Sequence, residues 1–418
     1  MARGSADEAA EREPAPPPDA VTSAPTQPRT PWQRLSRDTR ALLIVAAAVV
    51  LANLPYVVGV FDADPLGPRS GLVTAVTPGP LMGQPTIDPN NGFISQALTH
   101  RAALDLVHLQ WPWWNPYQAT GAPLAGDMQS AALFPPSLLT LLRNGQLYER
   151  MLLEIVAGLA TFLLLRRLSV NRWAAVPAAV AFALNGTFAW FSHAAVNPVA
   201  FLPLLLLGIE TAYAASIARR AGGWWLIAVA GAMSFYAGFP EVAYLDALFA
   251  GAWLIWRCVR LDRARVAALG GKVAAGAVVG VLLAAPLLVT SIHFLGQTDL
   301  QRHDARSFGD VHLPFSALPQ LVLPYVHGPI FGATDSKFVI LNTWGGLGGF
   351  LSTSLLLFGL LGLLSPGRRG LRLVLSGWIV LALPLMYASP PVLTEVVGAL
   401  PGMSRVIFSR YAFPSVEL

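Results

Sequence analysis

The sequence predicts an all-α polytopic membrane protein, because it is too apolar and too poor in charge for a water-soluble domain. Of its 418 residues, 54% are hydrophobic and only 12% are charged, whereas roughly a quarter of a soluble domain is charged. Runs of about 20 apolar residues, the length that crosses a bilayer, recur along the chain. The formal charge of +5 comes from short Lys and Arg clusters between these runs, as topology signals do. We therefore expect a membrane-lipid environment and no nucleic-acid partner.

The amino-terminal residues are expected to differ from the rest. Residues 1–40 are rich in Pro, Ala and charge and have little to bury, so they predict a disordered cytoplasmic tail. The first apolar run follows and is interpreted as an uncleaved transmembrane helix, residues 41–61. The single cysteine, Cys258, excludes an internal disulfide.

The apolar runs give about nine candidate spans by length. They begin near Ala41, Met151, Trp173, Val199, Trp224, Val242, Val273, Gly346 and Leu371. Basic clusters occupy alternate gaps: Arg34, Arg37 and Arg40; Arg166, Arg167 and Arg172; Arg219 and Arg220; Arg257, Arg260, Arg263, Arg265 and Lys272; Arg368, Arg369 and Arg372. Since positive loops stay inside, we expect a multi-pass plasma-membrane protein whose amino terminus is cytoplasmic.

This topology divides the remaining chain into alternating segments. Residues 62–150 form a long extracytoplasmic loop, 151–292 hold spans two to seven, 293–345 form a second long outer loop, 346–387 hold spans eight and nine, and 388–418 form an outer tail. Long structured loops are usually functional. We therefore expect any active site to face outward, in the first loop above all.

The first outer loop predicts two interfacial helices joined by a Trp- and Pro-rich link. The stretch from Asn91 to Gln110 has helical character and places Arg101, Asp105 and His108 on one stripe. This stripe favours an interfacial helix facing a wet cavity, and the alternative is a plain surface ion pair of Arg101 and Asp105. The link carries tryptophans suited to the headgroup level, and "ALFPPSLLTLL" predicts the second shallow helix.

Two motifs in this loop resemble a known family. "IDPNNGFISQAL", Ile87 to Leu98, and "WNPYQATGAPLAGDMQSAALFPPSLL", Trp114 to Leu139, look like the opening motifs of the YfhO-type bacterial membrane proteins. That family resembles the GT-C glycosyltransferases, multi-span helix bundles that move a sugar from a polyprenyl-phosphate carrier to an outer acceptor. Family members are often much longer, so the chain is expected to be a fragment or a shortened member.

The resemblance implies an inverting transfer to a cell-envelope glycan acceptor, with an Asp as general base. Asp88 matches the family's Asp before the first interfacial helix and is the expected base. Asp62 and Asp64 match an early acidic pair that could hold a divalent cation, Mg²⁺ or Mn²⁺, and Asp127 is a further catalytic candidate. For each carboxylate the alternative is a solvated loop residue or a turn former.

Substrate-binding candidates lie in the same outer segments. The stretch from Trp111 to Pro136 is expected to form one wall of the acceptor site, and His193, Asn197 and Glu241 lie at outer turns or span ends. Basic residues near span ends are candidates for the carrier phosphate. The full set of binding candidates is Trp113, Trp114, Asn115, Gln129, His193, Asn197, Glu241, Arg302, Arg306, Lys337, Arg405 and Arg410.

Two other functions stay open at this point. A lipid or glycan transporter or flippase would need broken helices, polar groups at mid-membrane and repeat symmetry, whereas no internal repeat is evident and the carboxylates cluster in the outer loops. Asp246, within an expected span, is a separate functional candidate, because ionisable residues are rare there. A non-catalytic envelope-assembly protein would need no site. The sequence contains no nucleotide-binding loop, zinc spacing or nucleophile elbow.

Overall fold

The fold was analysed in a computed structural model, which describes residues 35–60, 94–118, 120–185, 194–297, 308–323, 353–364 and 367–418. The chain divides into two units, residues 1–40 and residues 41–418. Of the first unit, only Leu35 to Arg40 is described, where helix α2 begins. All contacts below are within the second unit.

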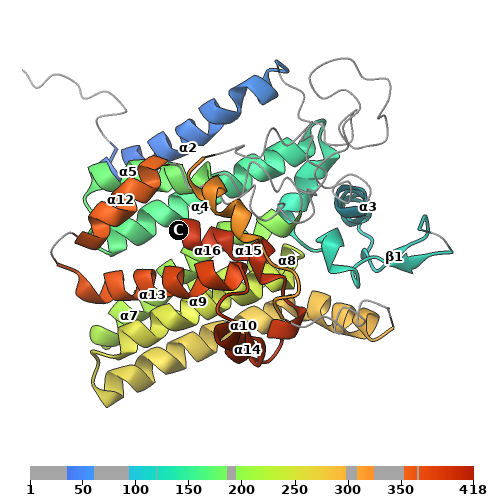
Figure 1. Cartoon of the computed structure of the whole chain (residues 1–418). Coiled ribbons are helices and arrows are strands. Elements are labelled where there is room, and N and C mark those ends of the chain that lie inside the picture. Colours follow the sequence, from blue (N-terminus) through green and yellow to red (C-terminus); the bar gives the residue numbers. More distant parts are fainter. Residues whose placement is uncertain are drawn as a thin grey trace, which may run out of the picture. The chain divides into compact units, whose positions relative to one another are not determined.

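Helices dominate the described chain, and one lies at each of the nine expected spans (Figure 1). They are α2 (Arg37–Val57), α4 (Gly145–Arg167), α5 (Arg172–Ala183), α7 (Leu202–Ile217), α8 (Trp225–Tyr236), α9 (Pro240–Cys258), α10 (Arg263–Leu295), α12 (Thr353–Leu364) and α13 (Arg369–Met386). The short 3₁₀ helix η5 (Ala194–Phe201) leads into α7. The prediction of an all-α membrane protein is thus confirmed in its class.

The span count of nine is not confirmed. Four segments within the described residues are long and apolar enough to cross a membrane: Arg37–Val57, Asn197–Ile217, Arg263–Leu295 and Arg369–Met386. The others fall short for identifiable reasons. Helix α4 carries Glu149, Arg150 and Glu154 near its start, α9 carries Glu241, Asp246 and Arg257, and α5, α8 and α12 have only 12 described residues each.

Small residues bring the helices together. Helices α8 and α10 run side by side (Figure 1), and a Cβ at Gly280 of α10 would lie 3.0 Å from the carbonyl oxygen of Ala228 of α8. A Cβ at Gly158 of α4 would lie 2.8 Å from a methyl group of Val45 of α2. Close backbone approach at Gly and Ala is the usual way that helices associate in lipid. These contacts fix the bundle on which the loops are built.

The first long loop is folded where it is described. It contains α3 (Gln96–Val107), a hairpin of β1 (Trp114–Asn115) and β2 (Ala122–Pro123), and two 3₁₀ helices, η3 (Met128–Ser130) and η4 (Pro135–Leu141). A helix, α3, lies where the first interfacial helix was expected, and its N-cap, Ser95, makes no side-chain cap hydrogen bond. Its position at a membrane interface stays a prediction. The second expected helix is the 3₁₀ helix η4, and Pro135 and Pro136 open it, where a missing backbone N–H is tolerated.

The carboxyl-terminal residues fold back onto the bundle. This part contains η7 (Phe315–Leu321), α14 (Pro391–Gly398), η8 (Met403–Arg405), α15 (Phe408–Tyr411) and α16 (Phe413–Glu417). The indole of Trp378 in α13 donates to the hydroxyl of Ser415 at 2.9 Å, and Phe413 is fully buried. The expected outer tail is therefore a packed part of the fold.

Candidate functional site around Asp127

The tryptophan-rich link folds as a short hairpin with an indole on its backbone. Trp114 pairs with Pro123 and Asn115 with Ala122 across β1 and β2. Gly121 has φ of +105°, and a Cβ there would lie only 2.5 Å from Cζ2 of Trp114. Gly is required at this position both for its positive φ and for the space that the indole occupies. The sequence "TGAP" thus lets Trp114 close over the hairpin.

Asp127 follows the hairpin and caps η3. Its Oδ1 accepts a hydrogen bond from the backbone N–H of Gln129 at 3.0 Å, which fixes the direction of the carboxyl group. Burial raises the pKa of Asp127 above its ordinary value, and the hydrogen bond from Gln129 partly opposes this shift. A carboxylate with a raised pKa is a better proton acceptor than a solvated one. Asp127 is therefore both oriented and chemically suited to act as a base.

The loop that carries Asp127 is anchored on the end of α10 and on the α8–α9 turn. The carbonyl of Ala125 accepts hydrogen bonds from the hydroxyls of Thr290 and Ser291 at 3.5 and 3.4 Å. A Cβ at Gly126 would lie 2.8 Å from Cβ of Phe294. A Cβ at Gly238 would collide with the carbonyl oxygen of Met128. The loop is thus held from both sides rather than lying free on the surface.

Helix α3 supports the hairpin through one ion pair. Arg101 pairs with Asp105 one turn later on α3, and its guanidinium lies 5.2 Å from the ring centroid of Tyr117 in the hairpin turn. Asp105 is buried, so the pair is not the plain surface pair considered as an alternative. Arg101 instead joins α3 to the hairpin turn at Tyr117, since a cation is attracted to the face of an aromatic ring.

Aromatic side chains line the exposed edge of this region. Trp111 and Trp113 stack with centroids 5.6 Å apart. Between 42% and 78% of the surface of Trp111, Trp113, Trp114 and Tyr117 is exposed. Such exposure is unusual for large aromatic residues in contact with water and is typical of the membrane interface or of a carbohydrate-binding surface.

The described binding candidates have separate roles. Oδ1 of Asn115 accepts from the backbone N–H of Tyr117 at 3.1 Å, so its side chain shapes the turn. Gln129 orients Asp127 through its backbone. Asn197 is buried in η5, and Glu241 accepts from the backbone N–H of Ile407 at 3.3 Å. The structure therefore groups Trp113, Trp114, Asn115, Asp127 and Gln129 in one loop, whereas Glu241 contacts the carboxyl-terminal segment.

The other candidates lie outside what the structure describes. Residues Asp62, Asp64, Asp88, His193, Arg302, Arg306 and Lys337 fall outside the described ranges, and the side chains of Arg405 and Arg410 are not described. Among the described residues, no group of three or more His, Cys, Asp or Glu side chains could hold a metal ion. The roles of these residues, including the cation at Asp62 and Asp64, stay predictions.

A buried polar network between α2 and α4 was not expected from the sequence. Nδ2 of Asn53 donates to Glu154 at 2.7 Å, and Arg150 donates to Oδ1 of Asn53 at 3.1 Å. The only signal was a group of three charged residues in "ERMLLE", at the start of an apolar run. Asn53 and Glu154 are both buried, so the network satisfies polar groups that the helices would otherwise leave unpaired.

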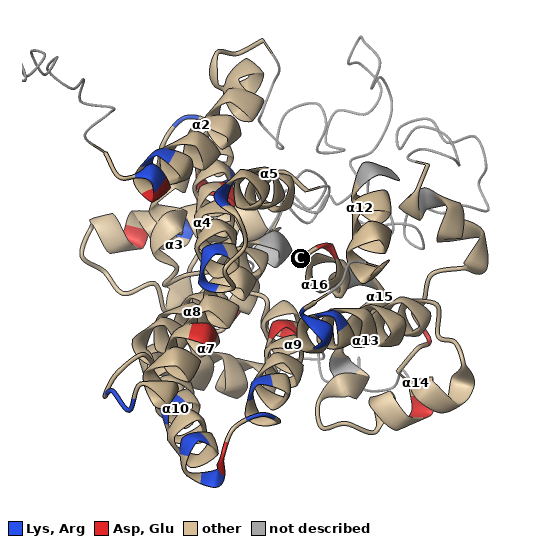
Figure 2. Cartoon of the chain, turned by 90° about the vertical axis from the view of Figure 1, so that its left-hand side faces the viewer, with Lys and Arg blue, Asp and Glu red and all other residues tan. Residues whose placement is uncertain are grey.

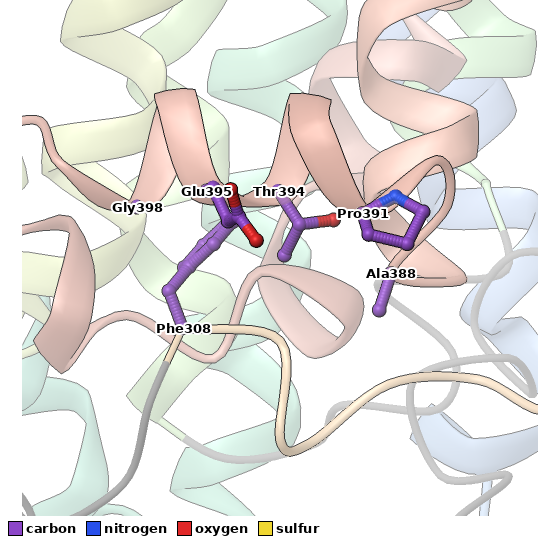
Figure 3. Close-up of a pocket in the computed structure, with 6 residues that line it drawn as sticks. All are labelled: Phe308, Ala388, Pro391, Thr394, Glu395 and Gly398. Carbon is purple, nitrogen blue, oxygen red and sulfur yellow. The ribbon is translucent and has the colours of Figure 1, made fainter.

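A cavity of about 420 Å³ lies between α14 and the segment that precedes η7. Figure 3 shows Phe308 opposite Glu395 and Thr394 of α14. Among the described residues that line it, Glu395 is the one ionisable side chain, and it was not a candidate from the sequence. Its signal was weak, since a single carboxylate in "PPVLTEVVG" is usually a solvated helix residue.

Lys and Arg residues gather at the end of the long helices that lies away from the Asp127 loop. Figure 2 looks toward the ends where α9 stops and α10 and α13 begin, and Lys and Arg lie there. Nζ of Lys272 in α10 donates to the carbonyl of Arg220 at 2.8 Å, which brings two of the expected basic clusters together. Helix α10 therefore runs from the basic end to Thr290 and Ser291, where the Asp127 loop binds.

Comparison with known proteins gives one match. The family model described as "Bacterial membrane protein YfhO" matches residues 130–328. No curated protein and no solved structure matches the chain. The two motifs quoted for the resemblance lie mostly before Ser130, so the match rests largely on other parts of the chain. The match confirms the expected resemblance: over residues 130–328, somewhat less than half of its length, the chain is similar to the YfhO bacterial membrane proteins.

Proposed function

We propose that the chain is an integral-membrane glycosyltransferase of the GT-C type, which moves a sugar from a polyprenyl-phosphate carrier to a cell-envelope glycan at the outer face. The single observation that carries this proposal is the anchored loop with Asp127 at the end of α10 away from the basic cluster. Because positive charge stays in the cytoplasm, this loop belongs on the extracytoplasmic side of a plasma-membrane protein.

The chemistry requires few protein groups. The acceptor hydroxyl attacks the anomeric carbon, the bond from that carbon to the carrier phosphate breaks, and a carboxylate takes the hydroxyl proton. Attack opposite the leaving phosphate inverts the configuration of the anomeric carbon. Asp88 is the first candidate for the base because of its motif, and Asp127 is supported by its orientation and its raised pKa.

The remaining candidates would bind the two substrates. Trp113 and Trp114 expose apolar faces that suit a sugar ring or the headgroup region. The leaving phosphate needs cations, which Arg302, Arg306, Lys337, Arg405 and Arg410 would supply. Asp62 and Asp64 remain the proposed residues for a divalent cation, and no step above depends on it.

A second function, transport or flipping of a lipid or glycan, is favoured by polar groups inside the bundle. Oδ2 of Asp246 in α9 is buried and has no hydrogen-bond partner among the residues that the structure describes. Asn53, Arg150 and Glu154 form the network between α2 and α4. Intramembrane polar groups of this kind often mark transport pathways. A non-catalytic role in envelope assembly is the third possibility.

The test is sugar transfer by the purified chain with a panel of labelled polyprenyl-phosphate sugars and an envelope glycan acceptor. Asp88→Asn and Asp127→Asn are compared with Asp262→Asn, a helix cap at the basic end whose capping hydrogen bond Asn can replace. Loss of a general base costs about 10²–10⁴-fold in rate. Full activity of both Asp88→Asn and Asp127→Asn would contradict the assignment of either residue as the base. Absence of transfer by the wild type would favour transport or assembly.

A further inference from the structure

A second cavity, of about 480 Å³, lies at the basic end of the bundle. Its walls come from four parts of the chain: the end of α4, the middle of α7, the end of α9 and the start of α13. Its charged lining residues are Arg167, Glu210, Arg257, Arg260, Arg368 and Arg369. Three basic clusters that are far apart in the sequence therefore meet around one space.

The lining is strongly positive. Five arginines face one glutamate, which gives the wall a formal charge of +4. Within the described part of the chain, no acidic side chain pairs with Arg167, Arg260 or Arg369. A topology signal alone requires positive charge in each loop, but it does not require that separate loops converge on a cavity.

The inner wall of this cavity is rigid. Arg257 donates two hydrogen bonds to Glu210, at 2.6 and 2.5 Å, and the indole of Trp253 donates a third at 2.7 Å. The guanidinium of Arg257 also lies 4.5 and 4.0 Å from the ring centroids of Tyr213 and Trp256. These hydrogen bonds and ring contacts hold the guanidinium of Arg257 in place in the cavity wall.

The start of α13 closes the other side. The ring nitrogen of Trp256 occupies the space where Gly370 would carry a Cβ, so the first turn of α13 packs directly on α9. Arg368 donates to the carbonyl of Ser169 at 2.9 Å, which ties this turn to the end of α4. The amino terminus of α13, an 18-residue helix, thus borders the same positive space and adds its partial positive charge.

We propose that this cavity binds a phosphate group. Arginine forks match the oxygens of phosphate, and basic pockets between transmembrane helices on the cytoplasmic side bind anionic headgroups. The same chemistry can come from an anionic lipid in the membrane or from a phosphate compound in the cytoplasm. The inference does not rest on the proposed glycosyltransferase activity, because the cavity lies at the opposite end of the bundle from Asp127.

The test uses the purified full chain in phosphatidylcholine nanodiscs. In one arm, phosphatidylglycerol replaces part of the lipid, and bound phosphatidylglycerol is counted by native mass spectrometry. In the other arm, inorganic pyrophosphate is added to phosphatidylcholine nanodiscs, and the shift in unfolding temperature is measured. The variant is Arg260→Gln with Arg369→Gln, and the control is Arg219→Gln with Arg220→Gln, which removes the same charge outside the cavity.

We expect the cavity variant to bind phosphatidylglycerol about 25-fold more weakly, at roughly fivefold per arginine, and the control to change less than about twofold. In the alternative outcome, the second arm responds instead of the first: the wild type binds pyrophosphate, the cavity variant does not, and both bind phosphatidylglycerol equally. This result would support the same site with a cytoplasmic ligand. Equal losses in both variants would show a diffuse surface effect and overturn the proposal. Failure of the cavity variant to change binding of either probe would also overturn it.

Discussion

The indole of Trp114 occupies the space beside Gly121 that any other residue would need for its Cβ. This contact closes the hairpin that precedes Asp127. It also links two positions of the sequence motif, "WNP" and "TGAP", that no local rule connects. The hairpin and the Asp127 loop are continuous in the chain, so a disturbance at Gly121 reaches the candidate site.

Gly121→Ala is therefore expected to displace Trp114 and to reduce sugar transfer at least tenfold. The substitution adds a clash to the strain of a positive φ. Gly222→Ala is the matched control, because Gly222 also has a positive φ, of +83°, but has open space around it. Limited proteolysis of the hairpin and the transfer assay measure the effect. Equal behaviour of the two variants would show that strain alone, and not the indole contact, matters.

Asp127→Asn is expected to separate stability from activity. Burial raises the pKa of Asp127 in the folded chain, so ionisation costs stability as the pH rises from the unfolded pKa through the folded pKa. Asn can accept the same hydrogen bond without a charge. The variant should therefore unfold at a higher temperature than the wild type at pH 8. Near pH 3 the carboxyl group of the wild type is largely protonated in both states, so the difference in unfolding temperature should vanish. A lower unfolding temperature at pH 8 would contradict a net cost of the buried charge.

Removal of one partner of the Glu210 and Arg257 pair should be more harmful than removal of both. Arg257→Met leaves Glu210 buried without its counter-charge and is expected to cost roughly 3–5 kcal/mol. The double variant Glu210→Leu with Arg257→Met should recover most of that loss. Unfolding in detergent, analysed as a double-mutant cycle, measures the coupling between the two side chains. Additive losses would mean that the pair is not coupled.

Cysteine labelling tests the orientation of the two ends. In a Cys258→Ser background, Tyr117→Cys in the exposed hairpin turn should react with a membrane-impermeant maleimide on intact cells. Ala264→Cys, exposed in the first turn of α10, should react only after permeabilisation. The reverse pattern would place the basic end outside and would move the proposed active site into the cytoplasm.

Different parts of this molecule were predictable to different degrees. Apolar runs and basic clusters predicted the helices, because both signals are local. The pattern of α3 also predicted the pairing of Arg101 with Asp105. The contact of Gly238 with Met128 and the meeting of Arg167, Arg260 and Arg369 could not be predicted, because they depend on how distant helices pack. Asp88, the favoured base, remains a prediction from a motif.

The shortness of α8 has a consequence for the depth of the Asp127 loop. Arg220 and Lys272 meet at the start of α8, and their charges belong at the headgroup level. From Trp224 to Gly238 the chain rises only about 20 Å at 1.5 Å per residue, whereas the hydrocarbon core is about 30 Å thick. If these charges lie at that level, Met128, which touches Gly238, is expected below the outer surface of the bilayer.

With this placement, the link between the hairpin and η4 would be a re-entrant loop. Irregular backbone is tolerated at that depth only where protein surrounds it, and Ser130, Ala131, Ala132 and Phe134 are fully buried. This placement accounts for a segment too polar to cross a membrane and too apolar for a solvated loop. If the proposed transfer takes place here, the carrier lipid reaches Asp127 sideways from the outer leaflet, and only the acceptor arrives from water.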